Sequence, residues 1–174
     1  VERTFSPTVS TTFSIVLRTL TFKMRPQKTL RKHPIGQSKP GGLVLNDRGL
    51  NSFKEIAYEH RNVEFLYLRE NEFREFNPYI SLPNLKVLDL SINSLTGSIQ
   101  FLPNLPSLRH LYLTGNVIES LEGISGCEYL ETLCISDNSI RSFEGLDNLP
   151  NLRVLSITNN FIESFAMYPY LPSL

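Results

Sequence analysis

The stretch Leu108-Arg109-His110-Leu111-Tyr112-Leu113-Thr114-Gly115-Asn116-Val117-Ile118 follows an eleven-residue frame, Leu-x-x-Leu-x-Leu-x-x-Asn-x-Leu. Four further copies of the frame flank it, and successive copies start 22 or 23 residues apart. These copies run from Val63 to Phe73, from Leu85 to Leu95, from Leu130 to Ile140 and from Leu152 to Ile162. Nothing else in the 174-residue chain is as regular, so this period is the best predictor of the fold.

Each frame predicts a short strand whose fourth and sixth residues point inward and stack on their counterparts in neighbouring units. The asparagine at the ninth position should end the strand, and its amide can pair with backbone groups of the turn and of the next unit. These structural asparagines are Asn71, Asn93, Asn116, Asn138 and Asn160. One unit cannot bury its own apolar side, whereas a stack can. We therefore predict a leucine-rich repeat solenoid of the α/β type with about six coils.

The segments between the frames predict how the two sides of the solenoid differ. Proline follows leucine at Leu82-Pro83, Leu105-Pro106 and Leu149-Pro150, which favours short 3₁₀ turns and loops on the convex side, opposite parallel strands on the concave side. Leu43, Leu45 and Leu50 fit an atypical first repeat, as expected of a capping coil. The chain stops at residues 171–174, which read as the opening of another repeat, so we expect the solenoid of residues 41–174 to be truncated at its C-terminal end.

Charge divides the chain into two parts. Residues 1–40 carry eight basic side chains and one acidic one, and residues 41–174 carry nine basic and sixteen acidic ones. The first part has four prolines and no sustained period, so we expect a basic, mostly disordered arm. Its candidate residues for binding a polyanion are Arg25, Lys28, Arg31, Lys32 and Lys39.

Several roles are compatible with this arm. Acidic tubulin tails, nucleic acid and anionic lipid all match its charge, and a solubilising tail or a mitochondrial transit peptide are further alternatives. Nucleic acid is disfavoured because the body is acidic and no motif that combines aromatic and basic residues is present.

The cysteines and the apolar segments indicate a compartment. Only Cys127 and Cys134 are present, without the paired cysteines that cap extracellular repeats, so a reducing compartment is expected. The apolar run at residues 13–17 is too short for a membrane span. We therefore expect a cytoplasmic protein, and a cytoskeletal one if the arm binds microtubules.

Two details resemble known families. Residues 121–124 and 143–146 carry Glu-Gly-Ile or Glu-Gly-Leu after the strand and resemble the intracellular class typified by the phosphatase regulator suppressor of Dis2. Residues 63–71, 86–91 and 111–116 resemble the leucine-rich domain of the plant and protist family of microtubule-associated proteins called auxin-induced in root cultures nine. The second resemblance covers about residues 43–174 in one register, and it implies a role on microtubules.

The outward positions of the strands provide the candidate site. Side chains alternate along a strand, so the third, fifth and seventh residues of each frame should face outward on the concave side. Aromatic residues and arginine dominate protein interfaces. The expected partner-binding residues, which could also simply cover the sheet, are Phe65, Tyr67, Arg69, Asp89, His110 and Tyr112.

Catalysis has little support in the sequence. There is no phosphate-binding loop, no nucleophile elbow and no metal-binding cysteine and histidine pattern, so no catalytic, cofactor or metal residue is predicted. His110 beside Asp89 could form an orienting pair, although a solvated histidine is the simpler interpretation. Cys134 is expected on an open face without a basic neighbour, which argues against a nucleophilic thiolate.

The predicted function is a non-catalytic scaffold that binds protein on its concave face and associates with microtubules through its arm. The alternatives are a regulatory subunit of a protein phosphatase and, with less support, a component of an RNA particle.

Overall fold

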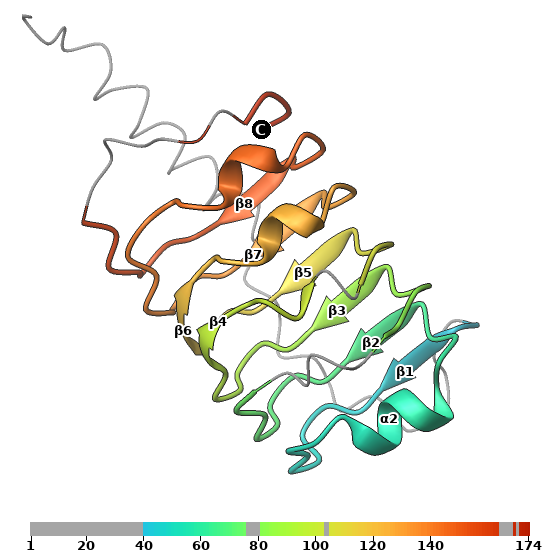
Figure 1. Ribbon diagram of the computed structural model, residues 1–174. Helices are drawn as coiled ribbons and strands as arrows, with labels where there is room; N and C mark the ends of the chain where they lie inside the picture. The colour runs from blue at the N-terminus through green and yellow to red at the C-terminus, as the bar shows by residue number, and fades with distance from the viewer. Residues whose placement is uncertain (1–39, 76–80, 103–104, 164–168, 170) are drawn as a thin grey trace, which may run out of the picture. The chain divides into compact units, whose positions relative to one another are not determined.

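The computed structural model describes residues 40–75, 81–102, 105–163, 169 and 171–174. These residues form a stack of coils in which a six-stranded parallel sheet runs in the order β1-β2-β3-β5-β7-β8 (Figure 1). The six strands are β1 (Gly42–Val44), β2 (Phe65–Tyr67), β3 (Val87–Asp89), β5 (His110–Tyr112), β7 (Thr132–Cys134) and β8 (Val154–Ser156). The predicted arm lies outside the described residues, except for Pro40.

The register of the sheet matches the repeat frame. Leu66 on β2 pairs with Leu88 on β3, and the same frame position continues through every later strand. Leu66, Leu88, Leu111 and Leu133 are fully buried, as the stack of inward leucines requires. Burying a leucine side chain stabilises a fold by about 1.5–3 kcal/mol, so this column is a main source of stability. The predicted fold class is therefore confirmed.

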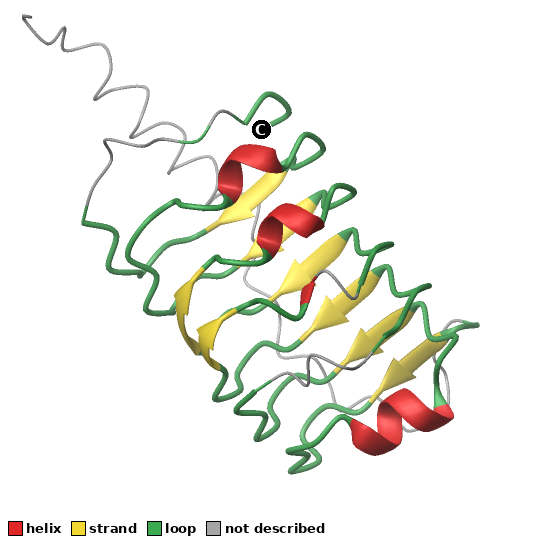
Figure 2. Cartoon of the chain, viewed as in Figure 1, coloured by secondary structure: helices red, strands yellow, loops and turns green. Residues whose placement is uncertain are grey.

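The side opposite the sheet consists mainly of loops and short helices (Figure 2). Two 3₁₀ turns, η2 (Ile124–Gly126) and η3 (Leu146–Asn148), follow the two Glu-Gly pairs of the sequence, as expected. The first coil differs, because it carries a six-residue α-helix, α2 (Lys54–Glu59). No helix in the described part of the chain is long and apolar enough to cross a membrane.

A second, two-stranded parallel sheet was not anticipated. It joins β4 (Thr96–Ser98) to β6 (Val117–Ser120), just after the asparagine turns of two neighbouring coils. Val117 also donates its backbone N–H to the carbonyl of Leu95, so the extra pairing continues the contact between these coils. The 23-residue spacing that precedes this part of the frame gives no sign of a second sheet.

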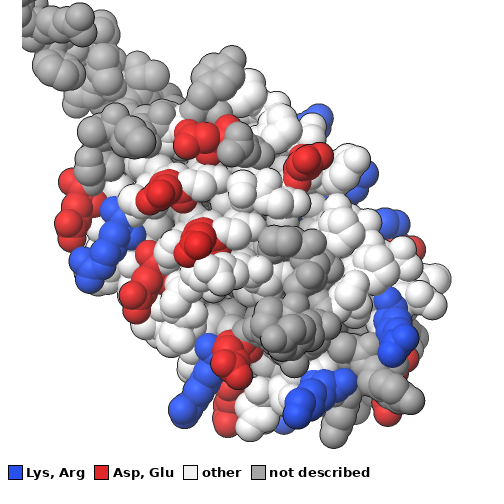
Figure 3. All heavy atoms as spheres, in the orientation of Figure 1, with Lys and Arg blue, Asp and Glu red and all other residues white. Residues whose placement is uncertain are grey.

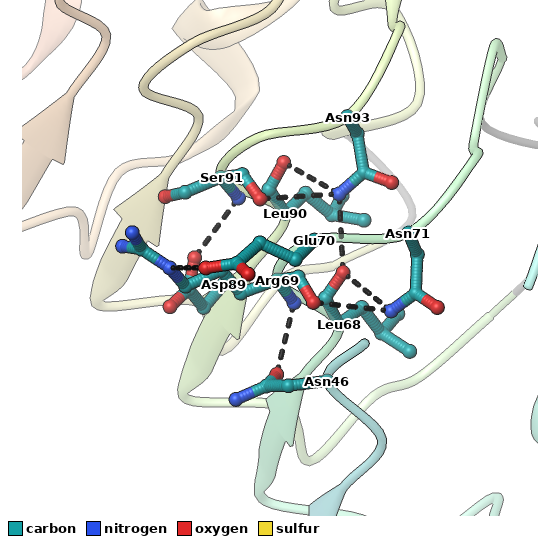
Figure 4. A network of polar contacts seen from close by, with 9 residues as sticks. All are labelled: Asn46, Leu68, Arg69, Glu70, Asn71, Asp89, Leu90, Ser91 and Asn93. Atoms are coloured by element: carbon teal, nitrogen blue, oxygen red, sulfur yellow. Dashed lines mark hydrogen bonds and ion pairs between the residues drawn. The ribbon is translucent and has the colours of Figure 1, made fainter. Parts of the chain in front are cut away.

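The frame asparagines form a hydrogen-bonded ladder between coils (Figure 4). The Asn93 amide donates to the carbonyl oxygens of Leu68 and Leu90 at 3.1 and 3.0 Å, and its own oxygen accepts the Phe73 N–H at 3.1 Å. Leu68 and Phe73 belong to the preceding coil. The expected pairing with the next coil was therefore wrong in direction, because each side chain turns back toward the coil already laid down.

Each coil also has a left-handed residue at the eighth position of the frame, immediately before the asparagine or its equivalent. The φ angles of these residues lie between 53° and 71°. They are Asp47, Glu70, Ile92, Gly115, Asp137 and Asn159. Glycine, asparagine and aspartate adopt this conformation at low cost, whereas a β-branched residue such as Ile92 is strained in it.

Candidate protein-binding face

The strand face is the outward side of the six-stranded sheet, formed by the third and fifth residues of each frame. Because the strands are in register, these residues form two continuous rows. The third-position row is Gly42, Phe65, Val87, His110, Thr132 and Val154. The fifth-position row is Val44, Tyr67, Asp89, Tyr112, Cys134 and Ser156.

Three of the six predicted site residues lie side by side in the fifth-position row. Tyr67 pairs with Asp89, and Asp89 pairs with Tyr112, on three adjacent strands. All three side chains are half-buried. Burial raises the pKa of both tyrosines above the ordinary value, and the negative charge of Asp89 raises it further. The row therefore places a carboxylate between two aromatic rings that remain neutral at physiological pH.

The other predicted residues lie around this centre. Phe65 and His110 are half-buried in the third-position row, separated by Val87. His110 Nδ1 lies 3.1 Å from the Thr132 hydroxyl, so its polar contact is with the next strand, and the alternative of an orienting pair with Asp89 is not what the structure shows.

Arg69 follows directly after β2 and is held in place by its neighbours. Its Nε lies 2.9 Å from Oε1 of Glu70, and its backbone N–H donates to the Asn46 side chain (Figure 4). Figure 4 also shows the carboxylate of Asp89 accepting the backbone N–H of Ser91, at 2.9 Å. The guanidinium thus forms its ion pair with Glu70 and not with Asp89.

Charges along one edge of the strand face form pairs between coils, which sequence reasoning did not identify. Lys86 Nζ lies 2.7 Å from Glu64 Oε2, and an Arg109 guanidinium nitrogen lies 2.6 Å from Glu131 Oε1. The hydrogen bond from Arg109 also lowers the pKa of Glu131. The signal was present, since the paired residues occupy the same frame position 22 residues apart. Figure 3 shows both signs of charge on the visible surface.

The far half of the strand face is small and polar, as predicted, but more enclosed than expected. Cys134 is only 3% exposed, so its expected place on an open face was wrong. Tyr112 and Ser156 flank it in the row, and burial raises the pKa of its thiol to about 11. The Ser136 hydroxyl lies 2.7 Å from that of Ser156 and accepts a hydrogen bond from Thr158 at 3.0 Å. These hydroxyls satisfy one another.

Residues outside this face add little to the candidate site. The predicted polyanion-binding residues Arg25, Lys28, Arg31, Lys32 and Lys39 lie outside the described residues. Among the residues that are described, no three histidine, cysteine, aspartate or glutamate side chains are grouped to hold a metal ion.

Comparison with known proteins agrees with this geometry. A family model for leucine-rich repeats, in two copies, matches residues 83–126 and 130–170. This chain is a leucine-rich repeat protein. The fold is generally a non-catalytic interaction module, and its repeats imply a role in binding other proteins.

Three curated relatives show how varied leucine-rich repeat proteins are. The chain is 36% identical over 105 residues to the 187-kDa microtubule-associated protein AIR9 of Arabidopsis thaliana, which covers 60% of the chain and 5% of that protein. It is 36% identical over 87 residues to the septation initiation network scaffold protein cdc11 of Schizosaccharomyces pombe (48% of the chain, 8% of that protein). It is 31% identical over 91 residues to acidic leucine-rich nuclear phosphoprotein 32 family member A of Drosophila melanogaster (52% and 35%). The chain thus spans about a third or less of each of these relatives.

Solved structures support the fold. The internalin inlF of Listeria monocytogenes superposes with a TM-score of 0.63 at 24% identity, over 68% of the chain and 34% of the internalin. TLR13, solved in complex with ssRNA13, gives a TM-score of 0.63 at 26% identity, over 72% of the chain and 19% of that protein. The first of these likenesses shows the fold alone.

Proposed function

We propose that this leucine-rich repeat chain is the protein-binding module of a non-catalytic scaffold associated with microtubules. In this proposal the strand face binds a protein partner, and the basic segment of residues 1–40 binds the acidic surface of tubulin. The observation that carries the proposal is the row Tyr67–Asp89–Tyr112, which presents half-exposed aromatic side chains at the centre of an ordered sheet. Aromatic anchors at the centre of a patch are typical of binding hot spots.

The microtubule part of the proposal has separate support. The relatives include a microtubule-associated protein and a scaffold protein, matched over about half of this chain or more. Residues 1–40 carry eight basic side chains and one acidic one, which suits a polyanionic surface. This part depends on the arm and not on the strand face, so the two parts can be tested independently.

The strand face is tested by partner capture with the full chain. The double variant Tyr67→Ala, Tyr112→Ala should lose the partners that the wild-type chain retains from a cell extract, as identified by mass spectrometry. Tyr129→Ala is the matched control, because Tyr129 is 54% exposed and lies in the connector before β7, outside the strand face. Capture that survives the double variant, or that is lost equally in the control, would place the binding site elsewhere.

The arm is tested by co-sedimentation of the full chain with stabilised microtubules across a salt series. Pelleting should weaken as salt rises, because screening acts over a Debye length of about 8–10 Å near physiological ionic strength. Reversing the charges with Arg31→Glu and Lys32→Glu should release the chain into the supernatant. If neither salt nor charge reversal changes the pelleted fraction, or if nothing pellets, the microtubule part of the proposal is wrong.

A further inference from the structure

The strand face has an unbalanced charge at its centre. Glu64 and Glu131, at the edge of the face, each have a basic partner on a neighbouring coil. Asp89 has none, and among the described residues it forms no ion pair. Its recorded hydrogen bond is with the Ser91 backbone N–H, through Oδ1. A half-buried carboxylate without a counter-ion is suited to a cation from outside the chain.

The two flanking tyrosines strengthen this preference. Adjacent strands lie about 4.8 Å apart, so a cation above Asp89 would be roughly 5 Å from the columns of Tyr67 and Tyr112. A cation is attracted to an aromatic face within about 6 Å of the ring centre. Neither tyrosine hydroxyl makes a hydrogen bond with another described residue, so both can accept one from a ligand.

Apolar surface beside the row suits the stem of a long basic side chain. Val44, 40% exposed, is next to Tyr67 in the fifth-position row, and half-buried Phe65 lies on the same strand as Tyr67. Arginine and lysine lay their methylene groups along apolar surface while the charged end reaches a polar partner. The nearest basic side chain after β2, Arg69, already pairs with Glu70.

We propose that the row Tyr67–Asp89–Tyr112 is a slot for a single cationic side chain, arginine or lysine, from an extended basic segment of the partner protein. The inference rests on the proposed function and adds the chemistry of the partner to it. Arginine is the better fit, because its planar guanidinium can stack on an aromatic ring and donate two hydrogen bonds to one carboxylate.

The raised pKa values agree with this geometry. The charge of Asp89 contributes to the raised pKa of Tyr67, of Tyr112 and of the Cys134 thiol. The carboxylate is therefore felt by three neighbours on the strand face, and each of them is disfavoured from becoming a second negative charge. A bound cation would relieve this effect, so binding should lower the pKa of both tyrosines.

The test uses the full chain and two synthetic peptides as probes. One is a blocked heptapeptide, Gly-Ser-Val-Arg-Val-Ser-Gly, and the other replaces its arginine by citrulline, a neutral side chain of nearly the same shape. Binding is followed by NMR through the ring signals of the tyrosines. The arginine peptide should bind about tenfold or more tightly than the citrulline peptide, as expected of a charge-assisted hydrogen bond. A lysine peptide measured in parallel shows which cation is preferred.

The decisive variant is Asp89→Asn. Its side-chain oxygen can still accept the Ser91 N–H, so the turn is preserved while the charge is removed. The preference for arginine over citrulline should disappear in this variant. It should persist in Glu128→Gln, which removes one negative charge from an exposed position outside the strand face. Equal binding of the two peptides by the wild type, or an unchanged preference in Asp89→Asn, would overturn the inference.

The two proposals fail in different ways. If Tyr67→Ala, Tyr112→Ala abolishes partner capture but the peptide preference ignores Asp89→Asn, the strand face binds a partner without a cation slot. If partner capture survives both changes, the proposed function of the strand face fails whatever the peptides do. A slot that binds the arginine peptide, in a chain whose Asp89→Asn variant also loses its partner, supports both.

Discussion

The asparagine ladder allows a quantitative prediction at Asn116. This side chain is 8% exposed, donates to the carbonyl oxygens of Leu90 and Leu113 at 3.0 and 2.9 Å, and accepts the backbone N–H of Leu95 at 3.0 Å. Replacing it with alanine removes three hydrogen bonds, each contributing about 1 kcal/mol to stability.

The groups left behind are not affected equally. The carbonyl of Leu90 keeps the amide of Asn93, and that of Leu113 keeps the amide of Asn138. The Leu95 N–H has no other recorded partner and would be left buried and unsatisfied, at a further cost of about 1–3 kcal/mol. Asn116→Ala should therefore lower the free energy of unfolding by about 3–5 kcal/mol, a large part of the 5–15 kcal/mol typical of a domain.

The assay is urea denaturation of the full chain, followed by circular dichroism at 25 °C. The control is Asn84→Ala, the same chemical change at an exposed residue of the turn before β3, where the loss should stay within about 0.5 kcal/mol. If Asn116→Ala were no more destabilising than this control, the ladder would not contribute to stability as argued, and the coils would be held together by leucine packing alone.

Three further predictions follow from the backbone and from the buried thiols. Gly123→Ala should destabilise the chain by several kcal/mol, about 3 or more, because its φ is 101° and an added Cβ would lie 2.6 Å from the Cα of Gln100; Gly97→Ala, with φ 71° and open space around it, should cost about 1–2 kcal/mol, and similar urea midpoints would contradict the clash. Ile92→Asn should raise the free energy of unfolding by about 1 kcal/mol, since a 45%-exposed β-branched residue with φ 53° gives way to one that tolerates this conformation, and a lower midpoint would refute the strain. The pKa of Cys127 is raised to about 12, so its contribution to stability is intact below the ordinary thiol pKa and is lost as the pH rises from about 9 to 12; Cys127→Ala should flatten that alkaline decline in thermal melts, and an unchanged slope would exclude the thiol as its cause.

The sequence predicts the inward side of this fold well and the turns poorly. Leucine spacing fixes the register of the strands, because only one alignment buries Leu66, Leu88 and their counterparts together. The asparagines mark the strand ends, but their spacing does not say that they bond to the preceding coil. Helix α2 and the left-handed Ile92 follow from tertiary packing that local propensity does not reveal.

The strand face follows a similar division. The frame predicts which residues share a row, since alternation along a strand and a fixed period leave no freedom. It does not predict which charges are satisfied within the chain. Glu64 and Glu131 find basic partners 22 residues away, whereas Asp89 has tyrosines as its neighbours in the row. The distinction appears only when the side chains are placed in three dimensions.

This division has a consequence for how such a chain acquires a partner. The buried fourth, sixth and ninth positions determine the stack, and the third and fifth positions can change without disturbing the leucine column or the asparagine ladder. Asp89 lies between two residues that no inward packing requires to be tyrosine, so stability alone does not explain this row. An aromatic pair around an unpaired carboxylate places apolar surface and charge in partial contact with water. The simplest physical reason for such an arrangement is a cationic side chain that covers it in the complex.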